Sequence, residues 1–426
     1  MERLNSLLGM ATLLGLAFLL SNNRRKIKLR TVAAGISLQV GLGVILLWWQ
    51  PGNQAFRWFA GQVHAFLQLS QVGVNFLFGE LGNPANYAEY GVQIALIIAS
   101  TIIFFSAFTA ILYYLGVMQW LVETMARFMR RVMGTSGAES LSCSANIFVG
   151  QTEAPLVIRP FLDGLTQSEL FAVMVGGFAT IAGGVMASYM SLGIPAPHLI
   201  AASVMSAPAA LVMAKIIFPE TERVATSGDA KIPRQKLYDN ALDAAARGTT
   251  DGLRLAANVI AMLISFLALL ALLDVILGWL DGIIDGRILG GTLTLEDGYS
   301  GIFPGRVRIL FGTIFRPLAF LIGVPWAEAG VVGNLLGIQI TANEFVSFVK
   351  LSELIHSGAL SERAATIATY SMCGFANFGS IGIQLGGIGA LAPGRRSDLS
   401  RLGLKAMFGG ALTSYLTGTV AGLLIA

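Results

Sequence analysis

Long apolar runs separated by short basic loops dominate this chain, and only folds that satisfy their backbone inside a lipid bilayer suit such a pattern. A helix needs roughly 20 apolar residues to cross the bilayer core. The chain has 426 residues, of which 55% are hydrophobic and 12% charged, whereas a soluble chain carries about 25% charged residues. We therefore expect an all-α membrane protein, a polytopic helical bundle whose length allows about eight to ten spans.

The net charge of +4 does not indicate a nucleic-acid partner. The basic residues cluster in short loops between apolar runs, which is a pattern of membrane topology. A metal or disulfide framework is not expected either. Cys143 and Cys373 lie in apolar surroundings, and His64, His198 and His356 are isolated from one another.

The basic loops predict the orientation of the spans, since Lys and Arg gather on the cytoplasmic side. The loop Asn22–Arg30, the arginines within 127–131 and the bases within 395–405 should all face the cytoplasm. The first apolar run precedes its basic cluster, which is the reverse of a cleaved signal peptide. We therefore expect a retained first span and both termini outside. The expected continuous spans are residues 7–20, 31–49, 91–118, 195–218, 252–280 and 406–425.

Two segments between these spans are expected to be external loops. Residues 51–90 are poor in Lys and Arg and contain a short apolar helix near 62–78, which either lies at the surface or is partly inserted. Residues 281–304 are rich in Gly and acidic residues. Residues 219–250 are polar with mixed charge and are expected to form a cytoplasmic loop.

Four other apolar segments are interrupted by polar or helix-breaking residues. Residues 134–163 and 323–353 carry Gly, Pro, Asn, Gln and Glu near their middle, and a re-entrant hairpin of two half-helices explains them. Residues 168–192 and 362–391 contain the tetrapeptides GFAT and GFAN. We expect these two segments to be broken helices.

The two halves of the chain repeat with matched spacing. Glu153 and Glu344 lie 191 residues apart (344 − 153), and Thr180 and Asn377 lie 197 apart (377 − 180). The basic loops make the first hairpin enter from the cytoplasm and the second from outside. Inverted repeats with broken helices are the design of many secondary transporters, so the pattern predicts a solute carrier.

Polar side chains inside the interrupted segments form the candidate substrate site, because such groups are costly at membrane depth. A more ordinary interpretation stays open: the glutamates would cap half-helices, and the amides and hydroxyls would make hairpin hydrogen bonds. The candidates are Gly150, Gln151, Thr152, Glu153, Glu344, Asn377 and Ser380.

This set of carboxylates, amides and hydroxyls contains no Lys or Arg, so an anionic substrate is not expected. A carboxylate accepts two hydroxyl protons, which suits a vicinal diol such as that of ribose. Amides read both donor and acceptor edges of a base. Phe375 would either pack on a flat ring or belong to the core.

A cation site is also indicated near the first break, since hard cations take oxygen ligands, often carbonyls freed where a helix breaks. Asn146, Thr180 and the carbonyls near Val149 and Ile181 are the candidate ligands. Asn and Thr beside Gly in membrane helices are, however, often satisfied locally.

The motif NIFVGQTEAPLVIRP at 146–160 resembles the first-hairpin motif of the concentrative nucleoside transporter family. GGFATIAGGVMASY (176–189), NEF (343–345) and CGFANFGSIGIQLGGIG (373–389) resemble the family's other motifs in the same order. The resemblance extends from about residue 90 to 425. It implies a bacterial, sodium-coupled member in the inner membrane that imports uridine-like nucleosides.

The resemblance also implies a homotrimer in which a scaffold holds the protomers together and a mobile transport domain carries both hairpins across the membrane. Residues 1–90 would be N-terminal scaffold helices and an external loop. The inverted repeats would be residues 91–250 and 251–426, each opening with a scaffold helix.

Matched motif by motif, the resemblance assigns roles to particular residues. The nucleobase would be faced by Gly150, Gln151, Thr152, Glu153 and Val185. The ribose would be held by Glu344, Asn377 and Ser380, with Phe375 beside the substrate. Sodium would be bound by Asn146, Val149, Thr180 and Ile181.

Two positions depart from the family pattern, and several functions stay open. Gln339 stands where a Lys is usual, and Gly379 where a second Ser is common. Asn146 favours sodium, but some relatives use protons. The residues also leave room for a carrier of another neutral polar solute such as a nucleobase, a channel, a membrane-embedded enzyme or a receptor without transport. No catalytic triad, P-loop or dinucleotide motif emerges, so we expect no enzyme activity and no cofactor besides a coupling ion.

Overall fold

Helices account for every regular element in the computed structural model, which describes residues 2–82, 86, 93–224, 226, 238–289, 293 and 301–425. Six helices within these ranges are long and apolar enough to cross a bilayer, or seven if the bent pair Val307–Leu321 and Trp326–Thr341 counts as one span. Composition alone allows more, because several apolar stretches form half-helices that are too short to cross. The all-α fold class with hairpins and broken helices is confirmed.

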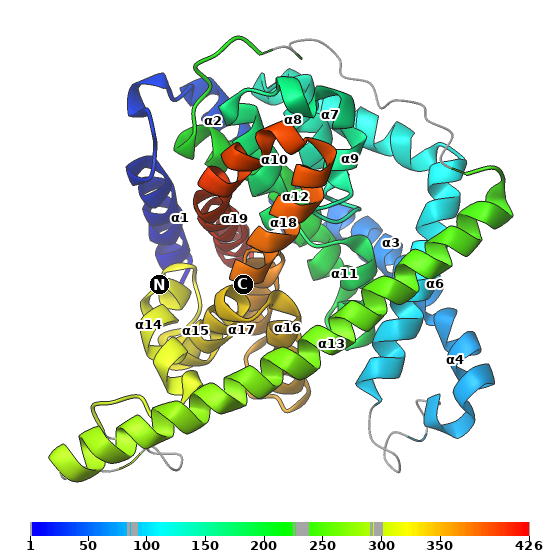
Figure 1. Cartoon of the computed structure of the whole chain (residues 1–426). Helices are drawn as coiled ribbons and strands as arrows, with labels where there is room; N and C mark the ends of the chain where they lie inside the picture. The colour runs from blue at the N-terminus through cyan, green and yellow to red at the C-terminus, as the bar shows by residue number, and fades with distance from the viewer. Residues whose placement is uncertain are drawn as a thin grey trace.

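Residues 2–82 form four α-helices, coloured blue in Figure 1. Helices are present where spans were expected at 7–20 and 31–49. The second ends in a π-helical turn at Val44–Trp48 and is long enough to cross a bilayer, whereas the first is a shorter apolar helix. The expected helix near 62–78 is instead two helices that begin directly after Trp49, because Pro51 favours a helix start. Their bounds are α1 Glu2–Leu19, α2 Leu29–Gly43, α3 Gln50–Gln68 and α4 Ser70–Phe78.

The first repeat has the expected order of a span, a surface helix, a hairpin, a broken helix and a second span. The hairpin arms are two short helices joined by non-helical residues 146–153, and the second arm continues as the 3₁₀ turn Arg159–Gly164. The bounds are α6 Ile94–Tyr114, α7 Val117–Met133, α8 Gly137–Ala145, α9 Ala154–Val157, α10 Gln167–Phe178, α11 Gly183–Ser191 and α12 Ala196–Ile217.

The second repeat follows the same order. Its broken helix is interrupted at residues 373–377, and its hairpin arms meet at Ala342 and Asn343. The bounds are α13 Ala241–Asp281, α14 Val307–Leu321, α15 Trp326–Thr341, α16 Glu344–His356, α17 Glu362–Met372, α18 Phe378–Leu391 and α19 Arg396–Leu424.

Two helices extend into stretches that the sequence predicts as loops. Helix α13 begins at Ala241, where Asn240 accepts a hydrogen bond from the Asp243 amide (2.9 Å), and continues as a π-helix to Ile288. Helix α19 begins at Arg396 rather than at 406. Both predicted boundaries were wrong because a helix that projects beyond the bilayer carries polar residues, just as a loop does. In the two predicted loops, residues 219–224, 238–240 and 301–304 are non-helical, whereas 225, 227–237, 290–292 and 294–300, which include Glu296 and Asp297, lie outside the described residues.

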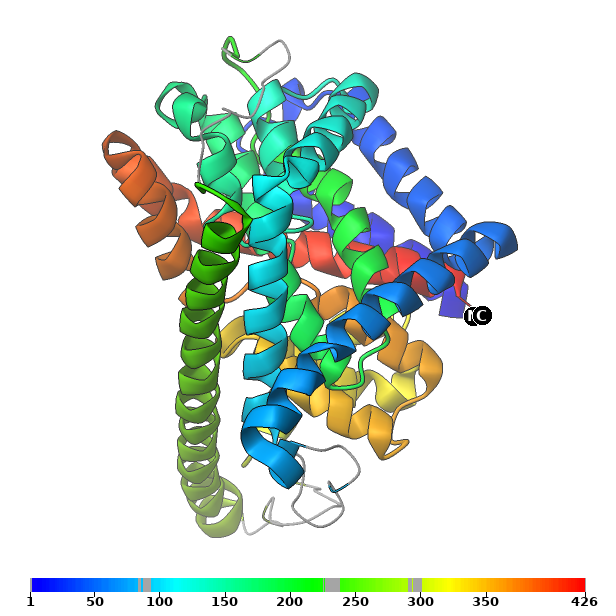
Figure 2. The same cartoon turned by 90° about the vertical axis from the view of Figure 1, so that its right-hand side faces the viewer.

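The helices pack as a buried bundle with a long exposed pair beside it. Helix α12 packs against α2 and α19, and α1 against α19. Helices α6 and α13 pack mainly on each other, and α13 runs along one side of the molecule (Figures 1 and 2). The apolar window of α12 is 89% buried and that of α13 only 6%. The core therefore lies around α10, α12 and α19.

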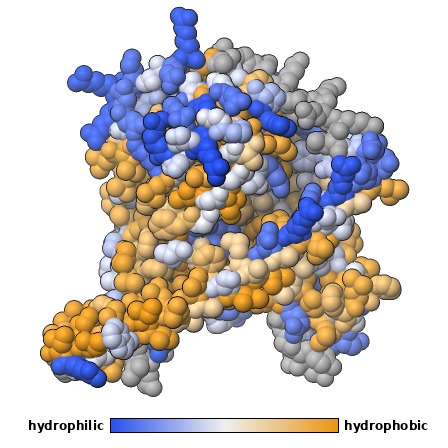
Figure 3. Space-filling view, in the orientation of Figure 1, coloured by the Kyte–Doolittle hydropathy of each residue, from blue (hydrophilic) through white to orange (hydrophobic). Residues whose placement is uncertain are grey.

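The three basic segments lie at one end of the molecule. In the first loop, the main-chain N–H of Asn22 donates to the carbonyl of Ile217 (2.9 Å), and the Asn22 side chain accepts from Lys405. Arg395 donates to the Leu165 carbonyl at the base of the first hairpin (2.6 Å). Hydrophilic residues gather along this upper edge in Figure 3, and apolar side chains cover much of the face below. The shared end agrees with a common cytoplasmic side for these loops.

The two hairpins enter from opposite ends. Helix α8 starts near the upper end in Figure 1, whereas α15 and α16 lie toward the lower end. Both termini lie away from the basic end (Figures 1 and 2). The two terminal helices are close together there, since a Cβ atom at Gly422 would be 2.9 Å from the Ser6 hydroxyl of α1. The repeats are thus inverted in space, as the sequence predicts.

Candidate substrate and cation site

The breaks of the two broken helices touch each other. The amide of Phe375 donates to the carbonyl of Thr180 across the contact (3.2 Å). Gly374 is needed here because a Cβ atom would lie 2.7 Å from the carbonyl oxygen of Phe178. The two GFA motifs, far apart in sequence, therefore form one centre where freed backbone groups meet inside the protein, as a membrane interior requires.

The middle of the first hairpin lies against the first break. The amide of Gly183 donates to the carbonyl of Phe148 (3.0 Å), and Ser203 of α12 donates to the carbonyl of Ile147 (2.9 Å). A Cβ atom at Gly150 would be 3.4 Å from that of Ala182, which is ordinary contact. Hydrogen bonds thus hold together two segments of irregular backbone, the middle of the first hairpin and the first break.

Glu344 is buried at the start of the second hairpin arm α16. It is not the helix cap, because Asn343 accepts the hydrogen bond from the Val346 amide (2.9 Å). Its two carboxylate oxygens instead accept from Tyr189 of α11 (3.2 Å) and from the Nδ2 atom of Asn377 (3.1 Å). Asn343 is therefore the N-cap of α16, and Glu344, in the first turn of that helix, links the second hairpin to both broken helices.

Gln151 links the first hairpin to α18. Its Nε2 atom donates to the Ser380 hydroxyl (3.1 Å). Asn377 caps α18, because its Oδ1 atom accepts from the Ser380 amide (2.8 Å) while its Nδ2 atom reaches Glu344. Four of the predicted substrate residues, Gln151, Ser380, Asn377 and Glu344, are therefore brought together in one network.

The other predicted substrate residues surround this network with fewer direct contacts. Glu153 accepts from the Gly150 amide (3.3 Å), which closes the hairpin tip. Thr152 and Glu153 are exposed, and Thr152 lies next to α18. Val185 is buried on α11 one turn before Tyr189, so both occupy the same helix face. Phe375 is partly buried at the second break.

The predicted cation ligands lie in two segments that contact each other, Asn146 and Val149 in the first hairpin and Thr180 and Ile181 at the first break. Asn146 is fully buried, and its Nδ2 atom donates to the Ser142 carbonyl (3.1 Å). Its Oδ1 atom has no hydrogen-bond partner among the described residues, and a buried acceptor without a partner is costly. Thr180 instead bonds locally, donating to the Gly176 carbonyl (3.0 Å). Val149 and Ile181 are also buried. The site fits a cation that takes the Asn146 oxygen and nearby carbonyls.

Two network residues were not among the predicted site residues. Tyr189 contacts Glu344 directly, and Gln384 of α18 donates to the Gln151 carboxamide oxygen (3.1 Å). A lone Gln in the apolar run 378–391 was the available signal for Gln384. Gln339, where the family usually has a Lys, is buried and donates to the carbonyls of Met372 (3.4 Å) and Gly374 (3.2 Å) at the second break. It therefore supplies donors to backbone acceptors that the break frees.

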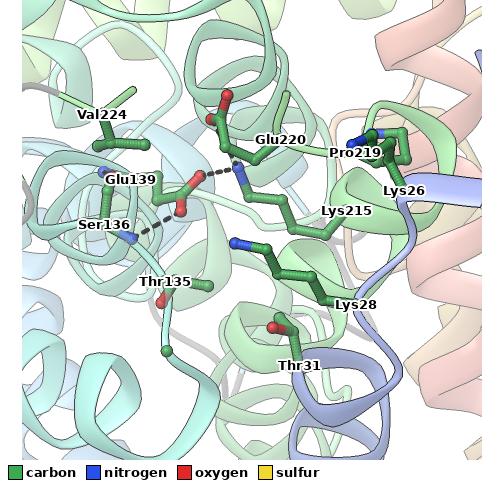
Figure 4. A pocket seen from close by; sticks show the side chains of 11 residues that line it. Lys26, Lys28, Thr31, Thr135, Ser136, Glu139, Lys215, Pro219, Glu220 and Val224 are labelled. Atoms are coloured by element: carbon green, nitrogen blue, oxygen red, sulfur yellow. Dashed lines mark hydrogen bonds and ion pairs between the residues drawn. The ribbon is translucent and has the colours of Figure 1, made fainter. Parts of the chain in front are cut away.

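A second polar cluster lies at the base of the first hairpin (Figure 4). Lys215 of α12 lies 2.6 Å from the Glu139 carboxylate of α8 and 3.7 Å from that of Glu220, and it donates to the Ser168 hydroxyl of α10 (2.9 Å). Lys28 points toward the same cluster. The adjoining cavity holds about 60 Å³, well below the roughly 300 Å³ of a ligand pocket. Its lining includes none of the predicted site residues, so this cluster anchors the hairpin rather than binding the solute.

Family models match almost the whole chain. Residues 8–81 and 198–422 match the N-terminal and C-terminal models of a Na⁺ dependent nucleoside transporter, and residues 95–196 match a model described as nucleoside recognition. An uncharacterized transporter of Haemophilus influenzae is 44% identical over 100% of this chain and 98% of its own length.

Relatives with functional names and solved structures agree with these models. Nucleoside permease NupC of Helicobacter pylori is 39% identical, covering 99% of this chain and 97% of the relative. Sodium/nucleoside cotransporter 2 of Rattus norvegicus is also 39% identical, covering 99% of this chain and 63% of the relative. The structure of CNTnw in an inward-facing substrate-bound state superposes with a TM-score of 0.91 at 41% identity, covering 100% of this chain and 98% of that one. This chain belongs to the concentrative nucleoside transporter family of multi-pass membrane proteins.

Proposed function

We propose that this protein imports uridine-like nucleosides across a bacterial plasma membrane by symport with sodium. The observation that carries the proposal is the buried carboxylate of Glu344, whose side-chain partners are a hydroxyl and an amide rather than a basic group. Such a carboxylate retains acceptor capacity for the hydroxyls of a neutral solute. Anionic substrates would meet like charge there.

The proposed substrate residues fall into two groups, one suited to the ribose of a nucleoside and one suited to its base. Glu344, Asn377 and Ser380 hold the ribose, since a carboxylate, an amide and a hydroxyl suit a vicinal diol. Gln151 presents an amide suited to a base edge. The remaining contacts to the base come from Gly150, Thr152, Glu153 and Val185, with Phe375 next to the substrate.

Sodium binds between the first hairpin and the first break in this proposal. The unpartnered Oδ1 atom of Asn146 supports the site, together with Thr180 and the carbonyls of Val149 and Ile181. The cation would hold the hairpin tip against the break, so sodium binding would organise Gln151 for the solute. This contact is the physical basis for coupling.

Alternating access follows an elevator motion within a homotrimer. A solved structure of a CNTnw variant in an outward-facing state superposes with a TM-score of 0.90, so relatives of this fold adopt both facings. The scaffold consists of the exposed pair α6 and α13 together with the N-terminal helices of residues 1–90. The bundle that carries both hairpins moves against this scaffold. The exposed apolar face of α13 supplies the contact between protomers. Both termini face the periplasm.

Nucleoside binding to the purified protein tests the substrate class. We expect uridine to bind more tightly in sodium than in choline. Uracil, which lacks the ribose, and 2′,3′-dideoxyuridine, which lacks the diol, should each bind at least about tenfold more weakly, since neither offers Glu344 the two hydroxyl donors of the diol. Equal binding of uracil and uridine would instead indicate a nucleobase carrier.

A further inference from the structure

A chain of side-chain amides fixes the geometry around Gln151. Gln384 is fully buried on α18, and its Nε2 atom donates both to the main-chain carbonyl of Met174 on α10 (3.1 Å) and to the Oε1 atom of Gln151 (3.1 Å). Gln151 in turn donates from its Nε2 atom to the Ser380 hydroxyl (3.1 Å). The first hairpin, α10 and α18 are thus joined through a single carboxamide.

The direction of these hydrogen bonds is determined by the backbone. A main-chain carbonyl can only accept, so the amide nitrogen of Gln384 has to face Met174. The second N–H of the same nitrogen then faces Gln151, which has to present its oxygen. The Gln151 carboxamide therefore has one orientation, in which its nitrogen faces Ser380.

In this orientation, Gln151 keeps one hydrogen-bond donor and one acceptor available for a ligand. An amide has two N–H donors and two acceptor lone pairs, and Gln151 uses one of each for Ser380 and Gln384. It can offer the remaining donor and acceptor in a fixed spatial order. Uracil presents an N3–H donor beside an O4 acceptor, whereas cytosine presents an N3 acceptor beside an N4–H donor. A freely rotating amide would accept either base, but an oriented one distinguishes them.

We propose that Gln384 is a positioning residue that sets base selectivity by orienting Gln151. The inference rests on the proposed function, in which Gln151 faces the nucleobase. Gln384 does not itself touch the solute. Its effect passes through the Gln151 oxygen.

A purely structural role explains the observations less well. The Oε1 atom of Gln384 is buried without a hydrogen-bond partner in the described part of the chain, and a half-satisfied buried amide is less stable than an apolar side chain of the same shape. Gly177 leaves room for the pair, because a Cβ atom there would lie 2.7 Å from the Gln384 nitrogen and 3.0 Å from Cβ of Gln151. The space at this contact fits the two amides closely.

The test compares uridine with cytidine binding to the full-length purified protein in sodium. We expect the wild type to favour one of the two by at least about tenfold, because the wrong order of donor and acceptor leaves buried groups unpaired. Gln384→Met keeps the side-chain length but removes both donors. It should bring the ratio to within about threefold of one, while the ratio of uridine to 3′-deoxyuridine binding stays unchanged.

Two further variants distinguish a change in the orientation of Gln151 from a loss of protein stability. Gln339→Met removes another fully buried Gln whose acceptors are both main-chain carbonyls, so it should lower the thermal midpoint without changing the uridine-to-cytidine ratio. Gly177→Ala keeps every hydrogen-bonding group yet displaces the amide pair, and it should shift the ratio even if Gln384→Met does not fold.

Each outcome decides between a positioning role and a merely structural one. Equal wild-type affinities for the two nucleosides, or a ratio that neither Gln384→Met nor Gly177→Ala changes, would overturn the role of Gln384 while leaving the transporter assignment intact. Absence of any uridine binding by folded wild-type protein would overturn the proposed function itself.

Discussion

Glu344 is a carboxylate held in an apolar bundle by a tyrosine hydroxyl and an asparagine amide. Glu344→Gln would keep the size but replace an acceptor-only group with an amide, which cannot accept at both oxygen positions. Hydrogen bonds to a charged group contribute about 1.5–3 kcal/mol, so uridine affinity should fall by about 10- to 100-fold. Titration of purified protein measures this. Glu353→Gln, an exposed position on the same helix, is the matched control and should bind normally; equal losses in both variants would exclude a substrate role.

The proposed sodium site depends on a second single residue, Asn146. Asn146→Ala removes the unpartnered oxygen that would ligate sodium. The sodium concentration that half-saturates uridine binding should rise by about tenfold or more, with a smaller change in uridine affinity at saturating sodium. Asn75→Ala, at an exposed asparagine of α4, should leave the sodium dependence unchanged. An unaltered sodium curve in Asn146→Ala would place the ion elsewhere.

Much of the candidate site could be predicted from single residues, because a polar side chain in an apolar run is conspicuous. Glu344, Asn377 and Gln151 stand out in this way. Their partners are harder to predict, since the contact between Gln151 and Gln384 joins positions 233 residues apart, and no local pattern encodes it. Tyr189 was missed for a related reason: an aromatic residue in a membrane helix is ordinary until its hydroxyl is seen to meet a carboxylate.

At the scale of elements, the base of the first hairpin is held by the ion pair of Lys215 with Glu139. Lys215→Met would leave Glu139 buried without its cation, which typically costs about 3–5 kcal/mol. The thermal midpoint of the purified protein should fall clearly. Adding Glu139→Gln should recover part of the loss, because no uncompensated charge remains while the amide can still accept from the Ser136 backbone. A double variant less stable than either single one would contradict this pairing.

The order of the elements could be predicted because hydrophobic runs, breakers and basic loops mark spans and hairpins independently. Their lengths could not. Helix α13 has 41 residues, about 60 Å at 1.5 Å per residue, which is twice the roughly 30 Å of a bilayer core. The polar N-terminal part of α13 continues the helix outside the lipid, where composition no longer distinguishes helix from loop. The early start of α19 has the same cause.

At the scale of the whole molecule, α13 exposes large apolar side chains along its length, among them Ile264, Leu272 and Trp279. Lipid or neighbouring protomers have to cover them. We expect three chains of 45.1 kDa each to associate in mild detergent. Native mass spectrometry should therefore detect a species at three times the chain mass. A protein that stays monomeric yet binds uridine would contradict the trimer and require lipid to cover this face.

Gradient-driven uptake tests the central claim most directly. Labelled uridine would be offered to proteoliposomes with an inward sodium gradient, with choline in place of sodium, and with an inward proton gradient, using Glu344→Gln as the inactive control. Sodium-coupled import predicts accumulation above the internal equilibrium level only with sodium. Accumulation driven by protons alone would contradict the sodium site at Asn146, and failure of every gradient to drive a nucleoside into vesicles that hold folded protein would contradict the proposed function.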